Sequence, residues 1–324
     1  MKAVPLPEDL PGKAELRQAR DRIYGKVHKT PLFTSARLNE SYKARIFFKA
    51  ENMQKAGAFK SRGAVNAVFS LTEKEASGGV CTHSSGNHAQ ALARAARLRG
   101  IPAFIVMPET APRVKINAVK SYGGKTIFCK PTLQAREETL ENVRQQTGAF
   151  PIHPYNDPAV IAGQSTVAQE IPEQLDNEPD YILCPVGGGG LLSGTALALH
   201  HFFRHTRVIA IEPRGADDAC RSFKSGELIP SVNPQTIADG MLTSLGNRTF
   251  PVMMNYVHDV LTVSEAGIIQ AMRYIWERMK LVVEPSAAVP LAAIFEHKIE
   301  VKNKTVVLVL SGGNLDLNRL PWQK

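Results

Sequence analysis

Short apolar runs alternate along this chain with longer segments in which apolar residues recur at helical spacing. Strands are predicted at residues 45–50, 79–83, 102–107, 125–129, 181–186, 207–212 and 305–310. Several of these runs lack the period-two alternation of a half-exposed strand, which is typical of strands covered on both faces. Helices are predicted between them, at residues 87–100, 133–148 and 265–280. This alternation predicts an α/β fold with a mostly parallel sheet and helices on both faces.

Composition leaves the number of domains open, but it favours a globular protein without a nucleic-acid patch. The chain has 324 residues, of which 44% are apolar, so it can bury one large core or two ordinary ones. No linker stands out, so a second domain would have to be inserted into the first. The 39 lysines and arginines exceed the 30 acidic residues without forming a run. This favours a solvated basic surface that attracts small anions over a nucleic-acid patch.

The cysteines and the N-terminus indicate the compartment. Cys81, Cys129, Cys184 and Cys220 show no metal-ligand spacing, which suits a reducing cytosol. The first residues, "MKAVPLPEDLPGKAEL", place prolines and acids where a signal peptide needs an apolar run. No stretch approaches the ~20 apolar residues of a membrane span. We expect a soluble, cytoplasmic protein.

Three glycine- or serine-rich turns follow predicted strands. In "CPVGGGGLLSG" (184–194), bare backbone N–H groups before a helix can bind a phosphate, although a tight turn is the alternative. The turn matches neither GxGxxG nor the P-loop. "THSSGNHAQA" (82–91) has more polar groups than one helix cap requires and would bind a carboxylate. "LVLSGGNLDL" (308–317) ends the last strand, and the three turns are expected to share one crevice.

A lysine with unusual neighbours, Lys60, is a candidate for a reactive amine in this crevice. Lys60 lies in "QKAGAFKSRGAVNA", among glycine and alanine. Burial of its stem would lower the pKa of the amine, which favours a nucleophile that forms Schiff bases. The alternative is an exposed lysine at a helix start. A lysine, a phosphate-binding turn and a strand-end hydroxyl together suggest pyridoxal 5′-phosphate.

Longer stretches resemble a known family. "GAFKSRGA", "SSGNHAQA", "VGGGGLLSG" and "LSGGN" resemble the fold-type II (tryptophan synthase β-like) pyridoxal-phosphate enzymes. "HPYNDPAVIAGQ", "TIADG", "ERMKLVVEP" and "PAFIVMPETAP" are similar to the serine racemases and their relatives, the serine/threonine and threo-3-hydroxyaspartate dehydratases. The resemblance implies a large parallel-sheet domain, residues 1–78 and 156–324, and a smaller inserted α/β domain, residues 79–155.

The resemblance also implies roles for single residues. Lys60 would bind the cofactor and Phe59 would pack beside its ring. The other cofactor contacts would be Asn87 at the phenolic oxygen, Ser311 at the pyridine nitrogen, and Gly187, Gly188, Gly189 and Gly190 at the phosphate. The substrate carboxylate would be bound by Ser84, Ser85, Asn87 and His88. Arg136 is a candidate for a second carboxylate, with a solvated arginine on a polar helix as the alternative.

A cation site and an effector site are implied less directly. In "EPRGADDA", Glu212 and Asp218 would supply carboxylates and Ala216 its carbonyl to Mg²⁺, Ca²⁺ or Mn²⁺, the alternative being a solvated acidic loop. Ala56 stands where the animal serine racemases have a threonine near their nucleotide site, which argues against ATP as an effector. Four other positions still match the nucleotide-contacting pattern: Lys55, Tyr122, Lys280 and Asn314. We expect a homodimer.

The activity implied is that of a pyridoxal-phosphate-dependent ammonia-lyase and amino-acid racemase. Lys60 would remove the α-proton of a small β-hydroxy amino acid, and loss of water would lead to a keto acid and ammonia. Ser85, on the opposite face, would return a proton and give the D-isomer. Serine, threonine and hydroxyaspartate remain open as substrates, so a threo-3-hydroxyaspartate or catabolic threonine dehydratase is an alternative. β-Replacement is a rival reaction, and a non-catalytic anion- or nucleotide-binding protein is a rival of another class, though it would not explain Lys60.

Overall fold

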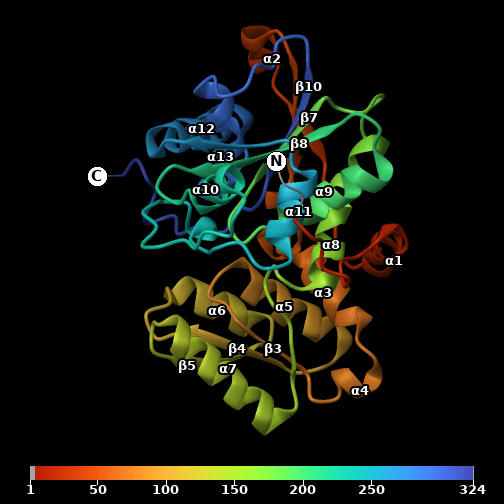
Figure 1. Cartoon of the computed structure of the whole chain (residues 1–324). Coiled ribbons are helices and arrows are strands. Elements are labelled where there is room, and N and C mark those ends of the chain that lie inside the picture. Colours follow the sequence, from red (N-terminus) through yellow and green to blue (C-terminus); the bar gives the residue numbers. More distant parts are fainter. Residues whose placement is uncertain (1–3, 324) are drawn as a thin grey trace.

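Two sheets organise the computed structural model, which describes residues 4–323 (Figure 1). The larger sheet has the strand order β1 (Leu32–Thr34), β2 (Arg45–Ala50), β10 (Thr305–Leu310), β7 (Tyr181–Pro185), β8 (Arg207–Pro213) and β9 (Asp259–Val263). The smaller sheet has the order β5 (Lys125–Cys129), β4 (Ala103–Pro108), β3 (Val80–His83) and β6 (Phe150–Pro151). Within these sheets β1 and β2 pair antiparallel and the other pairs are parallel.

The larger sheet is apolar on both faces because its strands alternate between two cores. Val307 and Val309 of β10 belong to the core formed with α8 (Pro158–Gln169), α9 (Gly190–Phe202) and α11 (Thr249–Tyr256). Val306, Leu308 and Leu310 belong to the opposite core, formed with α12 (Glu265–Met279) and α13 (Pro285–Phe295). Successive side chains of a strand point to opposite faces, so a continuous apolar run is what two covered faces require. The predicted α/β class is confirmed.

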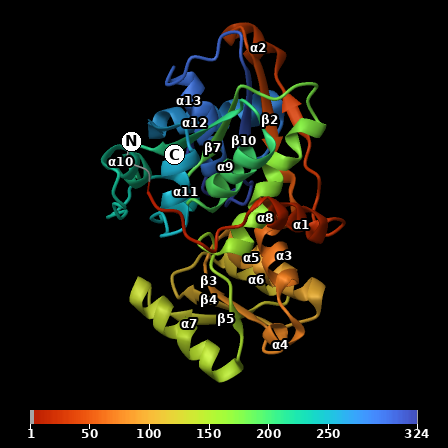
Figure 2. The same ribbon diagram turned by 45° about the vertical axis from the view of Figure 1, so that its right-hand side comes forward.

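The smaller sheet lies below the larger one in Figure 1 and belongs to a separate unit. One face packs on α5 (Asn87–Arg99), α6 (Arg113–Ser121) and α3 (Lys60–Ser70), and the other on α7 (Leu133–Thr147). The turned view in Figure 2 shows the chain entering this unit near α4 (Glu73–Ala76) and returning to the large unit at α8. We propose that residues 79–155 are the small domain and that residues 1–78 and 156–324 together form the large one.

The remaining helices lie at the surface of the large unit: α1 (Lys13–Ile23), α2 (Ala36–Tyr42) and α10 (Asp218–Ser225). Short 3₁₀ helices cover Glu51–Met53, Lys55–Gly57, Ile171–Glu173 and Asp239–Met241. Every predicted strand is present, with its ends shifted by at most one residue. The pattern missed β1, β6 and β9, because β1 and β6 have only three and two residues and β9 is a mixed polar and apolar edge strand.

A buried network of charges fixes the first turn of α3. The guanidinium of Arg62, which is fully buried, donates two hydrogen bonds to each of the carboxylates of Glu51 and Glu170. Lys49 on β2 donates to Glu170 at 2.6 Å and brings the number of positive charges to two, equal to the number of carboxylates. Buried charges are tolerated when they are paired and hydrogen-bonded. The network therefore holds α3, and with it Lys60, against the large sheet.

The structure bears on two further features, membrane-spanning helices and the state of the cysteines. None of the helices in residues 4–323 is long and apolar enough to cross a lipid bilayer. Cys81, Cys129, Cys184 and Cys220 are all buried free thiols.

Candidate active site

Lys60 is the first residue of α3 and reaches across to the loop after β6. Its Nζ donates to the carbonyl oxygen of Pro154 at 2.7 Å and lies 5.1 Å from the centre of the Phe59 ring. Burial lowers the pKa of the Lys60 ammonium to about 8. The positive end of the α3 dipole also disfavours a charged amine at this position. An amine with this pKa is partly unprotonated near neutral pH, as a nucleophile or proton acceptor must be.

The turn that precedes Lys60 is hydrogen-bonded to the backbone at the end of β10. Ala56 and Gly57 both have left-handed backbones, with φ of 55° and 70°, and a side chain on Gly57 would lie 2.4 Å from Asn314. The N–H of Phe59 donates to the carbonyl of Ser311 at 3.0 Å, and Ala58 pairs with Gly312. Ser311 is buried, with 3% of its surface exposed. The lysine segment and the "LSGGN" turn thus share one backbone junction.

Packing explains why the turn after β7 consists of glycines, in addition to any ligand. A side chain on Gly188 would lie 2.4 Å from the ring of Tyr155, and one on Gly187 would meet the backbone of Gly240 and Met241. Gly189 has a left-handed backbone with φ of 85°. Tyr155 directly follows Pro154, so the glycine turn and the Lys60 contact are fixed by one segment.

This turn also fits an anion. The backbone N–H groups of Gly187, Gly188 and Gly189 have no hydrogen-bond partner within residues 4–323, and α9 begins at Gly190. Unpaired N–H groups at a helix N-terminus are the usual binding site of a phosphate. The residues present therefore fit the phosphate of the expected cofactor.

Asn87 links the second motif to the third. Its Nδ2 donates to the carboxylate of Glu284 at 2.9 Å, and its Oδ1 accepts from Asn314 Nδ2 at 2.9 Å. Glu284 is buried, and burial together with the nearby charge of Asp239 raises its pKa to about 8. The sequence analysis missed Glu284, although an acid in the apolar run "LVVEP" before a helix-starting proline was a visible signal.

The serine-rich loop stands at the end of β3. Ser84 and Ser85 are half-buried, and the Ser84 N–H donates to the carbonyl of Val106 at 3.1 Å. His88 is buried; its Nε2 lies 3.3 Å from the carbonyl of Ile152, while its Nδ1 has no partner among the described residues. Burial and the charge of Lys60 keep the pKa of His88 well below its usual range. The imidazole is therefore neutral, with its free acceptor in the neighbourhood of Lys60.

Two further imidazoles, which the sequence analysis did not single out, lie in the same region. His83 immediately precedes the serine loop and His153 immediately precedes Pro154; their rings meet edge to face with centres 6.2 Å apart. Arg136 on α7 is half-buried rather than fully solvated, and its charge acts on His83. Histidines spread through a sequence give no local signal of shared position, which explains why they were missed.

The acidic stretch is not the solvated loop that was the alternative reading. Glu212 at the end of β8 and Asp218 at the start of α10 are only 1% and 2% exposed. Glu212 accepts from the N–H of Cys220 at 2.6 Å, and Oδ2 of Asp218 is buried without a hydrogen-bond partner in the described part of the chain. Burial raises the pKa of Glu212 to about 9 and that of Asp218 to about 6. Within residues 4–323 neither carboxylate forms an ion pair, although the charge of Arg221 acts on both, and two such buried carboxylates fit a cation.

The donor set at this acidic site is small. In the described part of the chain no group of three or more histidine, cysteine, aspartate or glutamate side chains could hold a metal ion. Further ligands would have to be backbone oxygens, such as that of the buried Ala216, or water.

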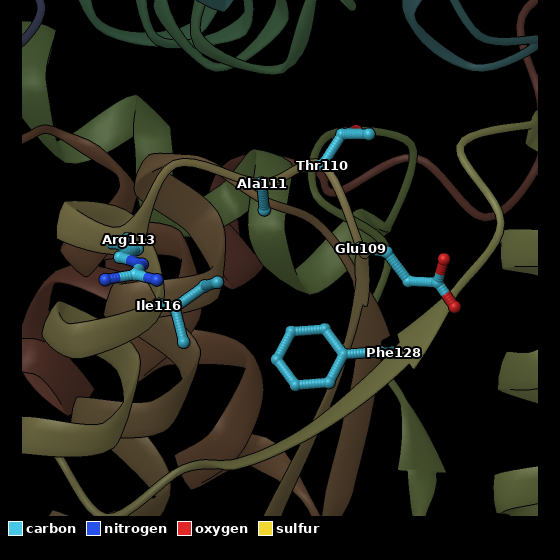
Figure 3. Close-up of a pocket in the computed structure, with 6 residues that line it drawn as sticks. All are labelled: Glu109, Thr110, Ala111, Arg113, Ile116 and Phe128. Atoms are coloured by element: carbon cyan, nitrogen blue, oxygen red, sulfur yellow. The ribbon is translucent and has the colours of Figure 1, made fainter.

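One cavity lies on the small unit and another lies between the two units. The pocket in Figure 3, of about 490 Å³, is on the small unit and is lined by Glu109, Thr110, Ala111, Arg113, Ile116 and Phe128. None of the predicted site residues lines it. A second cavity, of about 390 Å³, lies between the two units. Its lining residues include Asn314 and the ion pair of Lys115 with Asp239.

Comparisons with known proteins agree on one family. The family model described as pyridoxal-phosphate dependent enzyme matches residues 23–312. The beta-hydroxyaspartate dehydratase of Paracoccus denitrificans (strain Pd 1222) is 49% identical over 97% of this chain and 99% of the relative. The serine racemase of Arabidopsis thaliana is 48% identical over 94% of this chain and 93% of the relative. The solved structure of maize serine racemase is 43% identical, covers 95% of this chain and 94% of its own, and superposes with a TM-score of 0.91.

Proposed function

This chain belongs to the pyridoxal-phosphate dependent enzyme family, and on that premise we propose that it is a racemase and dehydratase of small β-hydroxy amino acids. The observation that carries the proposal is Lys60, whose buried amine has a pKa of about 8 at the junction of three polar turns. Relatives named as a β-hydroxyaspartate dehydratase and a serine racemase support the reaction class.

In this proposal each turn binds a different part of the cofactor. The backbone N–H groups of the glycine turn, Gly187 to Gly190, would hold its phosphate. Lys60 attaches it covalently, with Phe59 beside the ring. From the other two turns, Asn87 would bind its phenolic oxygen and Ser311 its pyridine nitrogen. Pyridoxal 5′-phosphate, when bound, supplies an electron sink for negative charge at the substrate α-carbon.

The protein groups move the protons. The Nζ of Lys60 accepts the α-proton of the L-substrate, because its lowered pKa leaves part of the amine unprotonated at neutral pH. The hydroxyl of Ser85, proposed to lie on the opposite face, delivers a proton when the D-isomer forms. The loop of Ser84, Ser85, Asn87 and His88 binds the α-carboxylate and so orients the α-hydrogen toward one base or the other.

A divalent cation, Mg²⁺ or alternatively Ca²⁺ or Mn²⁺, is proposed to bind Glu212, Asp218 and the carbonyl of Ala216. The support is the burial of both carboxylates and the unpaired Oδ2 of Asp218. Because these residues lie between the end of β8 and the start of α10, the ion would stabilise the structure there rather than act on the reacting atoms.

We further propose a homodimer that ATP activates little, because Ala56 lacks a hydroxyl. Sedimentation velocity tests the dimer. Turnover with Mg–ATP against Mg²⁺ alone tests the effector, and a several-fold rise would contradict the expectation.

One assay tests the function as a whole. Purified holoenzyme is supplied separately with L-serine, L-threonine and 3-hydroxyaspartate, and keto acid and D-isomer are followed together. Formation of a keto acid with ammonia supports elimination, and formation of a D-isomer supports racemisation. Absence of both products from all three substrates would refute the proposal. Sulfide-dependent formation of cysteine from an activated serine would instead favour β-replacement.

A further inference from the structure

The loop between β6 and α8, residues 153–157, contacts both Lys60 and the glycine turn. The carbonyl of Pro154 accepts from Lys60 Nζ at 2.7 Å. The ring of Tyr155 lies so close to Gly188 that a side chain on that glycine would be 2.4 Å from it. A displacement of this loop would therefore affect the amine and the phosphate-binding turn together.

Arg248, the residue before α11, binds this loop from the large unit. Its backbone N–H donates to Oδ1 of Asn156 at 3.0 Å, and its Nη1 donates to the backbone carbonyl of Asn156 at 3.2 Å. The charge of Arg248 also acts on His153 and Asp157, which are the two ends of the loop. The backbone and the side chain of one arginine thus hold the middle of the loop.

The guanidinium of Arg248 is held in turn by the segment that precedes α1, residues 4–12. Asp9 in this segment accepts from Nε at 2.9 Å and from Nη2 at 2.5 Å, and these hydrogen bonds are the main cause that lowers the pKa of Asp9 below its ordinary value. Figure 2 shows the segment, in red, running beside α11, where Asn255 donates to the carbonyl of Val4 at 2.7 Å. Because Nε and Nη2 are bound by Asp9, Nη1 is the donor left for the loop.

The ion pair of Asp9 with Arg248 would add little to stability by charge alone. The two side chains are 50% and 30% exposed, and exposed ion pairs contribute little. What the pair can fix is an orientation, because a planar guanidinium bound twice to one carboxylate also keeps its remaining donor in place. Small displacements near a reacting atom lower a rate far more than they lower stability, since the reaction needs groups in near contact.

We propose that Arg248 is a positioning residue for the cofactor and that Asp9 orients it. The guanidinium holds the loop where Pro154 faces Lys60 and where Tyr155 lies against the glycine turn. A cofactor attached to Lys60 then keeps its phosphate in that turn. The inference rests on the function proposed above and adds to the site a segment, residues 4–12, that none of the sequence motifs contains.

The first test measures how firmly variants of the holoenzyme retain the cofactor. Arg248→Gln should raise the rate at which the visible absorption is lost on dialysis about 10-fold, which is the order expected for one hydrogen bond to a charged group. Asp9→Asn should raise the rate less, because the guanidinium is still present. The double variant should match Arg248→Gln alone, since Asp9 acts through Arg248. Arg273→Gln removes a guanidinium that donates twice to Glu277 on α12, and this control should retain the cofactor as wild type does.

Hydrogen exchange in the same holoenzymes separates positioning from general stability. The backbone amides of Tyr155 and Asn156 donate to Nδ1 of His153, so their exchange reports on the loop itself. Arg248→Gln should speed the exchange of these two amides several-fold and leave the amides of α12 unchanged. If Arg248→Gln does not fold, Asp9→Asn provides the same comparison, because that substitution changes a half-exposed side chain of the same shape.

Three results would overturn the inference. These are unchanged cofactor retention in Arg248→Gln (or in Asp9→Asn where it replaces that variant), effects of Asp9→Asn and Arg248→Gln that simply add, and faster exchange spread evenly over the whole chain, which would show a merely structural role. A wild type that forms no visible band with pyridoxal 5′-phosphate is instead a failure of the proposed function.

Discussion

Replacing Arg62 by methionine should expose how much the first turn of α3 depends on buried charge. Arg62 donates to Glu51 through Nε and Nη2, each at 2.8 Å, and to Glu170 through Nη1 at 2.5 Å and Nη2 at 2.9 Å. The side chains of Arg62 and Glu51 are fully buried. Methionine keeps much of the aliphatic stem, so the substitution removes chiefly the charge and its hydrogen bonds.

The expected loss follows from what the variant leaves behind. Glu170 keeps Lys49 as a partner at 2.6 Å, whereas the hydrogen bond left to Glu51 within residues 4–323 is from the hydroxyl of Thr30 at 2.5 Å. Removing one partner of a buried ion pair costs about 3–5 kcal/mol, because the other charge remains buried. We expect Arg62→Met to lower the free energy of unfolding by this amount at pH 7. An exposed pair such as Arg144 with Glu141 contributes about 0–1 kcal/mol, so Arg144→Met is the matched control.

The pH dependence separates a charge effect from a packing effect. Burial alone would raise the pKa of Glu51, but the charge and hydrogen bonds of Arg62 outweigh burial and hold it below the ordinary value. In Arg62→Met that pKa rises above its value in the unfolded chain, so the native carboxyl takes up a proton at low pH. The loss should therefore be small near pH 4 and grow as the pH rises toward 7.

Urea unfolding of wild type, Arg62→Met, Glu51→Gln and the double variant at several pH values measures the coupling. The double variant, which has no unpaired acid at position 51, should recover most of the loss. A loss below about 1 kcal/mol at pH 7 would refute the argument from an uncompensated charge. So would a loss that is the same at every pH and in both variants.

Four other outcomes follow from the site. Lys60→Ala should abolish turnover and the visible absorption of the lysine-bound cofactor while far-ultraviolet circular dichroism stays unchanged; retained activity would disprove the role of Lys60. A chelator should lower the thermal midpoint, since a ligand at 100 times its Kd stabilises by about 2.7 kcal/mol, and Glu212→Ala and Asp218→Ala should abolish the chelator's effect. Ser85→Ala should reduce D-serine formation by ~10²–10⁴-fold and pyruvate formation from L-serine much less; equal losses would assign Ser85 to substrate positioning instead. Glu284, with a native pKa of about 8 against 4.5 unfolded, holds a proton that the unfolded chain loses, so wild-type stability should fall by about 1.4 kcal/mol per pH unit relative to Glu284→Gln between these values; parallel stability profiles would contradict the raised pKa.

Local pattern was sufficient for seven of the ten strands within residues 4–323 and for the chemical groups that follow strands. The apolar run of β10 predicts a strand covered on both faces, and the structure divides its residues between two cores. The glycines after β7 and the serines after β3 were visible because each turn directly follows an apolar strand, where ligands of parallel sheets bind. That these two strands belong to different sheets was not visible. The lowered pKa of Lys60 was expected from its small neighbours, and its value of about 8 agrees with that expectation.

The partners of these groups were decided by tertiary structure. Glu284 and Asn87 are 197 positions apart, and Arg62 and Glu170 are 108 positions apart, yet each pair is hydrogen-bonded. Tyr155 supplies a packing reason for the bare glycine at 188, which the sequence analysis explained by a phosphate or a tight turn. The spacing of hydrophobic residues along an element determines which of its sides is buried, because residues at that spacing lie on the same side. Which buried groups meet depends on the order of the strands and on how the two units stack, and those are set by the summed packing of segments far apart in the chain.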